Sequence, residues 1–256
     1  MQAYALKAAR EGKQETSWLN PNEAYEAGLQ TFLTRILDRS ASAEFINSLE
    51  TLAQRVALLG ALNSLSQITL KATMPGVPDF YQGTEFWDLS LVDPDNRRPV
   101  DFVERAAVLA SMATPDWESL AQNWSDGHLK LAWTRQLLKL RTELAEVFTH
   151  GEYQPLQVTG PHRDHVIAFA RRRGREAAII AVAKSFVPLS QGGRAWPRPE
   201  AFDGALQIKG YAVEGIHGEG SATELRLSTL FRQLPVAVLK ARFDRALRPV
   251  RKRMPA

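Results

Sequence analysis

The chain has 256 residues, of which 45% are hydrophobic and 23% are charged, and its formal net charge is +4. This composition is typical of a soluble globular protein with one large domain or two small ones. The sequence contains no cysteine, which excludes disulfide bonds, Cys-ligated zinc and a thiol nucleophile.

The N-terminal residues MQAYALKAAREGKQETSW are charged throughout and lack the apolar core of a signal peptide. No run in the chain is long and apolar enough to span a bilayer. With the absence of cysteine, this favours a cytoplasmic protein that has no membrane partner. The alanines and long straight-chain residues of positions 4–13 predict the first helix.

Two further helices are predicted before residue 75. Asn20 is a plausible N-cap, Pro21 suits the first helical position, and Glu23 stands three residues after the cap, so a helix is expected to run to about Leu37. A longer helix is expected over residues 43–72. Its apolar stripe, interpreted as core, consists of Leu49, Leu52, Val56, Leu59, Leu62 and Leu65.

Pro75 and Gly76 end this helix, and residues 77–81 are partly apolar and bounded by turn residues. They predict one buried strand, although Pro78 cannot donate a hydrogen bond to a neighbouring strand. A long irregular loop is expected to follow to about Pro99. Three helices are then predicted over residues 101–112, 115–123 and 129–144.

After Gly151 the pattern changes to short apolar segments separated by glycine, proline and polar turns, which is typical of antiparallel strands. Strands are predicted at 153–158, 166–172, 177–183, 205–208, 225–227 and 234–239. We therefore expect a domain of residues 1–150, an antiparallel β-domain of residues 151–245 and a basic tail of residues 246–256. The tail lacks interleaved aromatic residues and is interpreted as solvated, with no nucleic-acid partner.

The segment 75–102, PGVPDFYQGTEFWDLSLVDPDNRRPVDF, combines aromatic rings with carboxylates, amides and arginines. Such a mixture suits one wall of a sugar-binding cleft better than a core, because sugars bind through ring stacking and hydrogen bonds to hydroxyls. Tyr81 and Gln82 are candidates to present a ring and an amide to a glucose unit. Packing against the preceding helix is the alternative for both.

This segment closely resembles the region after the last barrel strand of the maltooligosyl trehalose synthases, which belong to the α-amylase superfamily (glycoside hydrolase family 13). The stretch from Trp87 to Asp101 is the most specific part of the resemblance. Two other matching stretches are Lys7–Asn22, with gaps, and Leu62–Gln67. The resemblance implies a fold of two parts, the C-terminal portion of a (β/α)8 TIM barrel followed by a small antiparallel β-domain.

The resemblance also implies a function. The family converts the reducing-end α-1,4 linkage of a maltooligosaccharide into an α,α-1,1 linkage by an intramolecular, retaining transfer, and needs no cofactor or metal. Its catalytic Asp, Glu and Asp lie on earlier strands, and no segment of this sequence resembles those motifs. The catalytic residues and the rest of the barrel are therefore expected upstream of Met1, and the chain alone is expected to be inactive.

The candidate substrate-binding residues share a place in or near the matching segments. They are Trp18, Asn20, Tyr81, Gln82, Glu85, Trp87, Asp93, Asp95, Asn96, Arg97 and Arg98. Glu85 is interpreted as an anchor beneath the cleft, and Trp18 and Trp87 as either sugar platforms or packing residues. The run from Asp93 to Arg98 is interpreted as a rigid loop, braced by Arg–Asp pairs, that shapes the reducing-end subsites.

Two other functions remain open at this stage. The chain could be a non-catalytic carbohydrate-binding or structural remnant, or a fragment of a different glucan hydrolase of the superfamily, although the stretch from Asp93 to Asp101 argues against the hydrolase. The letters His162-Arg163-Asp164-His165 resemble metal ligands but have the wrong spacing for one helix face, so a turn between strands is expected there.

Overall fold

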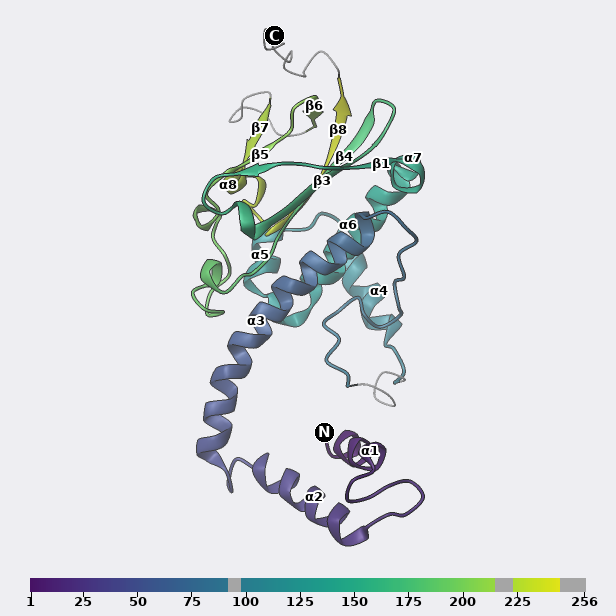
Figure 1. Ribbon diagram of the computed structural model, residues 1–256, viewed down its shortest axis with the longest axis vertical. Coiled ribbons are helices and arrows are strands. Elements are labelled where there is room, and N and C mark those ends of the chain that lie inside the picture. Colours follow the sequence, from purple (N-terminus) through teal and green to yellow (C-terminus); the bar gives the residue numbers. More distant parts are fainter. Residues whose placement is uncertain (92–97, 215–222, 245–256) are drawn as a thin grey trace, which may run out of the picture. The chain divides into compact units, whose positions relative to one another are not determined.

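The computed structural model describes residues 1–91, 98–214 and 223–244 (Figure 1). They form two compact units, of which the first comprises Met1–Arg55 and Asp88–Asp101 and the second Val56–Trp87 and Phe102–Ala256. The division runs through the long helix α3 (Ala43–Thr73). The sequence pattern predicted domain boundaries at residues 150 and 245. These boundaries stay a prediction.

The first unit contains α1 (Gln2–Gly12), α2 (Glu23–Ile36) and the first part of α3, which confirms the predicted helices. The predicted cap of α2 is wrong by two residues. Asn22 is the N-cap, and its Oδ1 accepts a hydrogen bond from the Tyr25 N–H at 3.2 Å. Asn20 is held in a turn instead, because its N–H donates to Ser17 Oγ at 3.0 Å.

The α-helices of the second unit that precede its strands are the rest of α3, α4 (Phe102–Ser111), α5 (Trp117–Gln122), α6 (His128–Glu143) and α7 (Ala145–His150). The helices predicted at 101–112, 115–123 and 129–144 are confirmed as α4, α5 and α6. The short helix α7 is an addition. It has six residues and follows α6 after a single residue, Leu144.

The apolar stripe of α3 is only partly core. Leu62 and Leu65 are fully buried, whereas Leu49, Leu52 and Val56 are 40%, 56% and 56% exposed. Helical spacing identifies an apolar face but not the element that covers it. The interpretation of the whole stripe as core is therefore wrong for its N-terminal half.

The strand predicted at residues 77–81 is absent. These residues form no regular element, and Val77 is fully exposed. A strand needs a neighbour with which to exchange hydrogen bonds, and Pro78 has no N–H to contribute. In the described part of the chain all strands lie between Glu152 and Phe243, so the barrel portion of the expected fold is not seen.

Within the described residues, eight antiparallel strands form two sheets, which confirms the predicted antiparallel region. The order is β1-β3-β4-β8-β6 in one sheet and β2-β5-β7 in the other. The bounds are β1 Glu152–Pro155, β2 Val158–Thr159, β3 Val166–Arg173, β4 Glu176–Ala183, β5 Ala205–Gln207, β6 Tyr211–Val213, β7 Glu224–Arg226 and β8 Val236–Phe243, with the short helix α8 (Leu227–Leu230) between β7 and β8. The single strand predicted at 153–158 is two strands, and β6 is an addition.

The central strand β4 is buried on both faces. It pairs with β3 and β8 in the antiparallel sense, with Ile180 opposite Phe169 on one side and Val238 on the other. Ile179 faces a core shared with the smaller sheet, whereas Ile180 faces a core shared with α3 and α6. Helices, the five-stranded sheet and the three-stranded sheet therefore form successive layers in the second unit (Figure 1).

The largest fully buried side chain in the described residues is a cation, Arg171 of β3. Its Nη1 donates to the carbonyl of Thr73, and its Nη2 donates to the carbonyls of Phe148 and Gly151, each at 3.0 Å. These carbonyls end α3 and α7, where helix dipoles concentrate negative charge. Burial, and secondarily the nearby Arg141, lowers the pKa of the Arg171 guanidinium.

Replacing Arg171 by methionine is expected to lower the free energy of unfolding by about 3–5 kcal/mol, because three buried carbonyls would lose their donor. The measurement is urea unfolding followed by circular dichroism. Arg173→Met on the same strand is the control, since this side chain is 51% exposed and pairs with an exposed Glu146. It should change stability by about 0.5 kcal/mol or less. Equal losses for the two variants would contradict the role of Arg171.

Candidate functional site

The segment that leaves α3, residues 74–87, is irregular and belongs to the second unit. The segment makes a turn at Tyr81, where the Thr84 hydroxyl donates to the Tyr81 carbonyl at 2.6 Å and the Thr84 N–H donates to the same oxygen at 3.3 Å. Gly83 lies in this turn with φ +87°, a backbone conformation that glycine adopts without strain. The side chains of Tyr81 and Gln82 are exposed.

Glu85 anchors the segment to α4. The Nε of Arg105 donates to Glu85 Oε2 at 2.8 Å, and its Nη2 donates to the Gly83 carbonyl at 3.1 Å. The Arg105 guanidinium also lies 4.7 Å from the centre of the Phe86 ring. A carboxylate held in this way is a structural group, while its place beneath a substrate cleft stays a prediction.

Trp87 attaches the other end of the segment to the helices. Its indole N–H donates to the Trp124 carbonyl at 2.6 Å, and its ring meets the Trp124 ring edge to face at 6.4 Å. The Lys130 ammonium donates to the Phe86 carbonyl at 3.0 Å and lies 5.7 Å from the Trp87 ring. Of the two interpretations of Trp87, these contacts favour packing.

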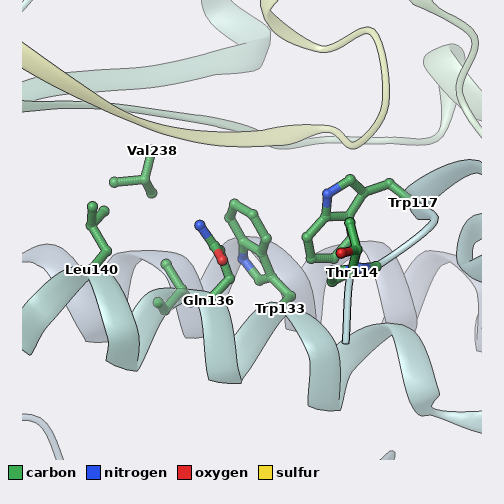
Figure 2. A pocket seen from close by; sticks show the side chains of 8 residues that line it. Thr114, Trp117, Trp133, Gln136, Leu140 and Val238 are labelled. Carbon is green, nitrogen blue, oxygen red and sulfur yellow. The ribbon is translucent and has the colours of Figure 1, made fainter. Parts of the chain in front are cut away.

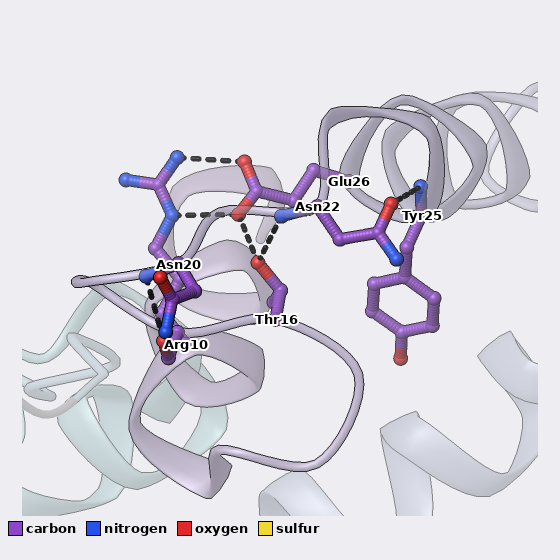
Figure 3. A network of polar contacts seen from close by, with 7 residues as sticks. Arg10, Thr16, Asn20, Asn22, Tyr25 and Glu26 are labelled. Atoms are coloured by element: carbon purple, nitrogen blue, oxygen red, sulfur yellow. Dashed lines mark hydrogen bonds and ion pairs between the residues drawn. The ribbon is translucent and has the colours of Figure 1, made fainter.

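Trp18 and Asn20 lie in the first unit, between α1 and α2. Figure 3 shows Asn20 in this turn. Trp18 is 57% exposed, and the Arg10 guanidinium lies 4.9 Å from its ring centre. Asn20 is also exposed. An exposed ring over a fixed cation remains suited to contact a sugar face.

A buried polar network holds this turn. Arg10 donates twice to Glu26, from Nε to Oε1 at 2.8 Å and from Nη2 to Oε2 at 2.6 Å. The Thr16 hydroxyl donates to Glu26 Oε1 at 2.6 Å and accepts from the Asn22 N–H at 2.9 Å (Figure 3). A bidentate pair with a shared hydroxyl fixes the geometry of α1, the turn and α2.

The sequence did not identify this network. Arg10 and Glu26 lie sixteen positions apart on two helices, and no local spacing relates them. The one sequence feature that pointed to this region was the resemblance of the stretch Lys7–Asn22, which contains Arg10 and Trp18, to the family.

The other candidates lie outside the described residues or at the surface. Asp93, Asp95, Asn96 and Arg97 lie outside the described residues, and Arg98 is exposed in the first unit. The sequence His162–His165 forms a turn between β2 and β3, as expected, and His162 Nδ1 accepts a hydrogen bond from the Asp203 N–H at 2.9 Å. No group of three potential metal ligands is found in the residues that the structure describes.

Several hollows occur in the second unit away from the predicted segment. One, of about 190 Å³, lies between α6 and β8 and is lined by residues that include Trp117, Trp133 and Val238 (Figure 2). The Trp133 indole N–H donates to Thr69 Oγ1 at 2.7 Å, so this ring is fixed. In the described helices, none is long and apolar enough to cross a membrane.

Comparison with known proteins identifies relatives over nearly the whole chain, although no family model matches. Two strains of Mycobacterium tuberculosis have a protein assigned as a maltooligosyl trehalose synthase that is 37% identical over 247 residues. The match covers 93% of this chain but 28% of the relative. The chain thus spans less than a third of the length of these curated relatives.

Solved structures give the same result. The maltooligosyltrehalose synthase of Arthrobacter ramosus matches 94% of this chain with a TM-score of 0.71 and 33% identity, and a point mutant of it matches with 0.73 and 32%. A hypothetical maltooligosyl trehalose synthase of Sulfolobus tokodaii matches 93% with a TM-score of 0.65 and 28% identity.

Hydrogen bonds from Arg10, and secondarily from Thr16, lower the pKa of the Glu26 carboxyl from 4.5 to about 2. Burial raises this pKa, but by less than the hydrogen bonds lower it. The unfolded carboxyl takes up a proton at a higher pH than the folded one, so Glu26 stabilises the fold above pH 4.5 and loses this effect as the pH falls towards 2. Hydrogen exchange of α1 and α2 at pH 6, 4 and 2.5 measures it. Glu26→Gln should accelerate exchange most at pH 6, and a difference independent of pH would contradict the prediction.

The resemblance in the sequence, the curated relatives and the solved structures all identify the same proteins, and this chain is therefore homologous to the C-terminal part of the maltooligosyl trehalose synthases.

Proposed function

We propose that this chain is the C-terminal part of an enzyme that converts the reducing-end α-1,4 linkage of a maltooligosaccharide into an α,α-1,1 linkage. The observation that carries the proposal is the 37% identity over 247 residues to a protein assigned to this activity. The family-specific stretch from Trp87 to Asp101 lies within the chain. The substrate is an α-1,4-linked maltooligosaccharide, and the location is cytoplasmic.

The proposed contribution of this chain is one wall of the substrate cleft. In the second unit the polar atoms of Glu85 and Trp87 are bound by Arg105 and by the Trp124 carbonyl, while Tyr81 and Gln82, which precede these two anchors, keep exposed side chains. A rigid support with a few outward groups suits a binding site. Tyr81 and Gln82 therefore contact a glucose unit.

The remaining candidates also contribute to substrate binding. Trp18 and Asn20 are exposed in a turn fixed by the Arg10–Glu26 pair, and such fixation lowers the entropy lost on binding. The run of Asp93, Asp95, Asn96, Arg97 and Arg98 shapes the subsites and excludes water, which favours isomerisation over hydrolysis.

The chemistry itself comes from the part of the relatives that this chain does not match. A retaining transfer needs a nucleophilic carboxylate and an acid/base group about 5 Å apart across the substrate. Glu85 does not suit either role, because its carboxylate is bound to Arg105. The chain alone is accordingly inactive.

The first unit supports the need for a covering partner. Ile46 is its only buried hydrophobic residue in the described part of the chain, while Phe32, Phe45 and Leu52 are 59%, 44% and 56% exposed. A unit with so little buried apolar surface gains little stability from the hydrophobic effect. We propose that the remainder of the barrel covers these side chains.

The coverage of 28% of the relatives favours one alternative, a non-catalytic carbohydrate-binding or structural chain. The two functions differ in whether the chain supports turnover when joined to the missing part.

The direct test replaces the matching part of the Arthrobacter ramosus synthase by this chain. With maltohexaose the chimera should give a product of unchanged mass that has lost its reducing end, and this chain alone should give none. Chromatography and a reducing-sugar assay measure both. Release of glucose and maltose, or no turnover by a chimera with a native circular dichroism spectrum, would contradict the proposed activity. Turnover by the chain alone would contradict its proposed dependence on the missing part.

In the same chimera Tyr81→Ala is expected to raise KM for maltohexaose about tenfold, because a stacking ring is removed from the cleft wall. Tyr153→Ala is the matched control, since this tyrosine of β1 is also exposed, at 44% against 57% for Tyr81. Its KM should be unchanged. Equal KM values for Tyr81→Ala and the parent chimera would remove Tyr81 from the site.

A further inference from the structure

A large open hollow lies in the second unit, remote in sequence from residues 74–102. It has a volume of about 1010 Å³ and is bounded by α5, by the segment 195–199 and by Arg232 and Gln233, which precede β8. Its size exceeds that of the cavity in Figure 2, and its lining is mixed aromatic and polar. This mixture is typical of sites for small polar molecules.

One wall of the hollow has a rigid backbone. It is the sequence Trp196-Pro197-Arg198-Pro199, in which each proline fixes its own φ and restricts the preceding residue. Arg198 accordingly has φ −84° and ψ 155°. Trp196 is partly buried and packs against both hydrophobic cores of the unit. The ring is therefore held in place before any ligand arrives, which lowers the entropy lost on binding.

The facing wall is α5, whose Glu118 and Gln122 are four residues apart and lie on one face of the helix. Arg232 and Gln233 complete the lining. In the described part of the chain, no hydrogen-bond partner is found for the side-chain polar atoms of Gln122, Arg232 or Gln233. These donors and acceptors are thus available to a ligand.

The charges that line the hollow cancel. Asp116 and Glu118 are opposed by Arg198 and Arg232. A site for an anion or a cation would have an excess of the opposite charge. Balanced charges, amides and an indole ring together suit an uncharged ligand with many hydroxyl groups.

The hollow continues along the same side of the unit. A neighbouring hollow of about 260 Å³ shares Arg232 and Gln233 with it and shares Trp117 and Trp133 with the cavity of about 190 Å³ (Figure 2). The Trp117 and Trp133 rings meet edge to face at 5.6 Å. A series of hollows with tryptophan rings suits an extended ligand better than a single sugar.

We propose that these three hollows form a second binding groove for a linear, uncharged oligosaccharide, with Trp196 as its main stacking platform. The choice of an α-1,4-glucan as the ligand rests on the proposed function, whereas the groove itself does not. The groove binds and positions the glucan chain and takes no part in bond breaking.

Isothermal titration of the chain with maltoheptaose tests the groove. Trp196→Ala is expected to raise the Kd of this binding at least about tenfold, and Gln122→Ala and Arg232→Ala each about threefold. The last two side chains are exposed, so their removal leaves the core intact. Arg175→Ala is the control for Arg232→Ala, because this exposed arginine lies in the turn between β3 and β4. It should leave Kd unchanged.

Tyr81→Ala separates this proposal from the previous one. If the groove binds and the segment near Tyr81 does not, the groove variants weaken all binding and Tyr81→Ala has no effect. If only the segment near Tyr81 binds, Tyr81→Ala weakens binding and the groove variants leave Kd unchanged, which overturns the groove. Absence of any heat of binding with maltoheptaose also overturns it.

Discussion

The buried guanidinium of Arg171 is the interaction on which the arrangement of the second unit depends. It lies on β3 and donates to carbonyls that end α3 and α7, so one side chain connects the sheet to two helices. The end of α3 is also where the polar segment begins, and Arg141 donates to the Ala72 carbonyl at 2.5 Å in the same place. A cation among carbonyls at helix ends is favourable because those carbonyls have no partner within the helix. The start of the candidate substrate wall is therefore fixed from the core of the β-rich region.

Internal hydrogen bonds also hold the candidate substrate wall, the segment 74–87. Glu85 and Trp87 look like ligand-binding residues in the sequence, yet Arg105 and the Trp124 carbonyl occupy their polar atoms. Their role is to hold the chain so that Tyr81, between the start of the segment and these anchors, keeps an exposed ring. A binding site needs both kinds of residue, and only the hydrogen-bond partners distinguish the supporting ones from those that face the ligand.

The first unit is organised differently, because polar contacts replace an apolar core. The Arg10–Glu26 pair with Thr16 joins α1 and α2, while Ile46 is the only buried hydrophobic residue in the described part of the unit. Apolar residues such as Phe32 and Leu52 remain exposed. An apolar helix face that is patterned for burial needs an element to cover it, and under the proposed function this element is the part of the relatives that the chain does not match.

The sequence by itself determined the longer helices, most of the antiparallel strands and the family, because hydrophobic periodicity, turn residues and the Trp87–Asp101 stretch are local signals. It did not determine the cap of α2, where Asn20 and Asn22 are equally suitable in composition and only the turn at Ser17 selects Asn22. It predicted a strand at residues 77–81 that is absent, since strand formation depends on a partner that the local pattern does not contain. The contacts of Arg171, of Arg10 with Glu26 and of Trp196 were decided by the tertiary structure alone. They join residues far apart in the chain, and their energies depend on burial, which only folding produces.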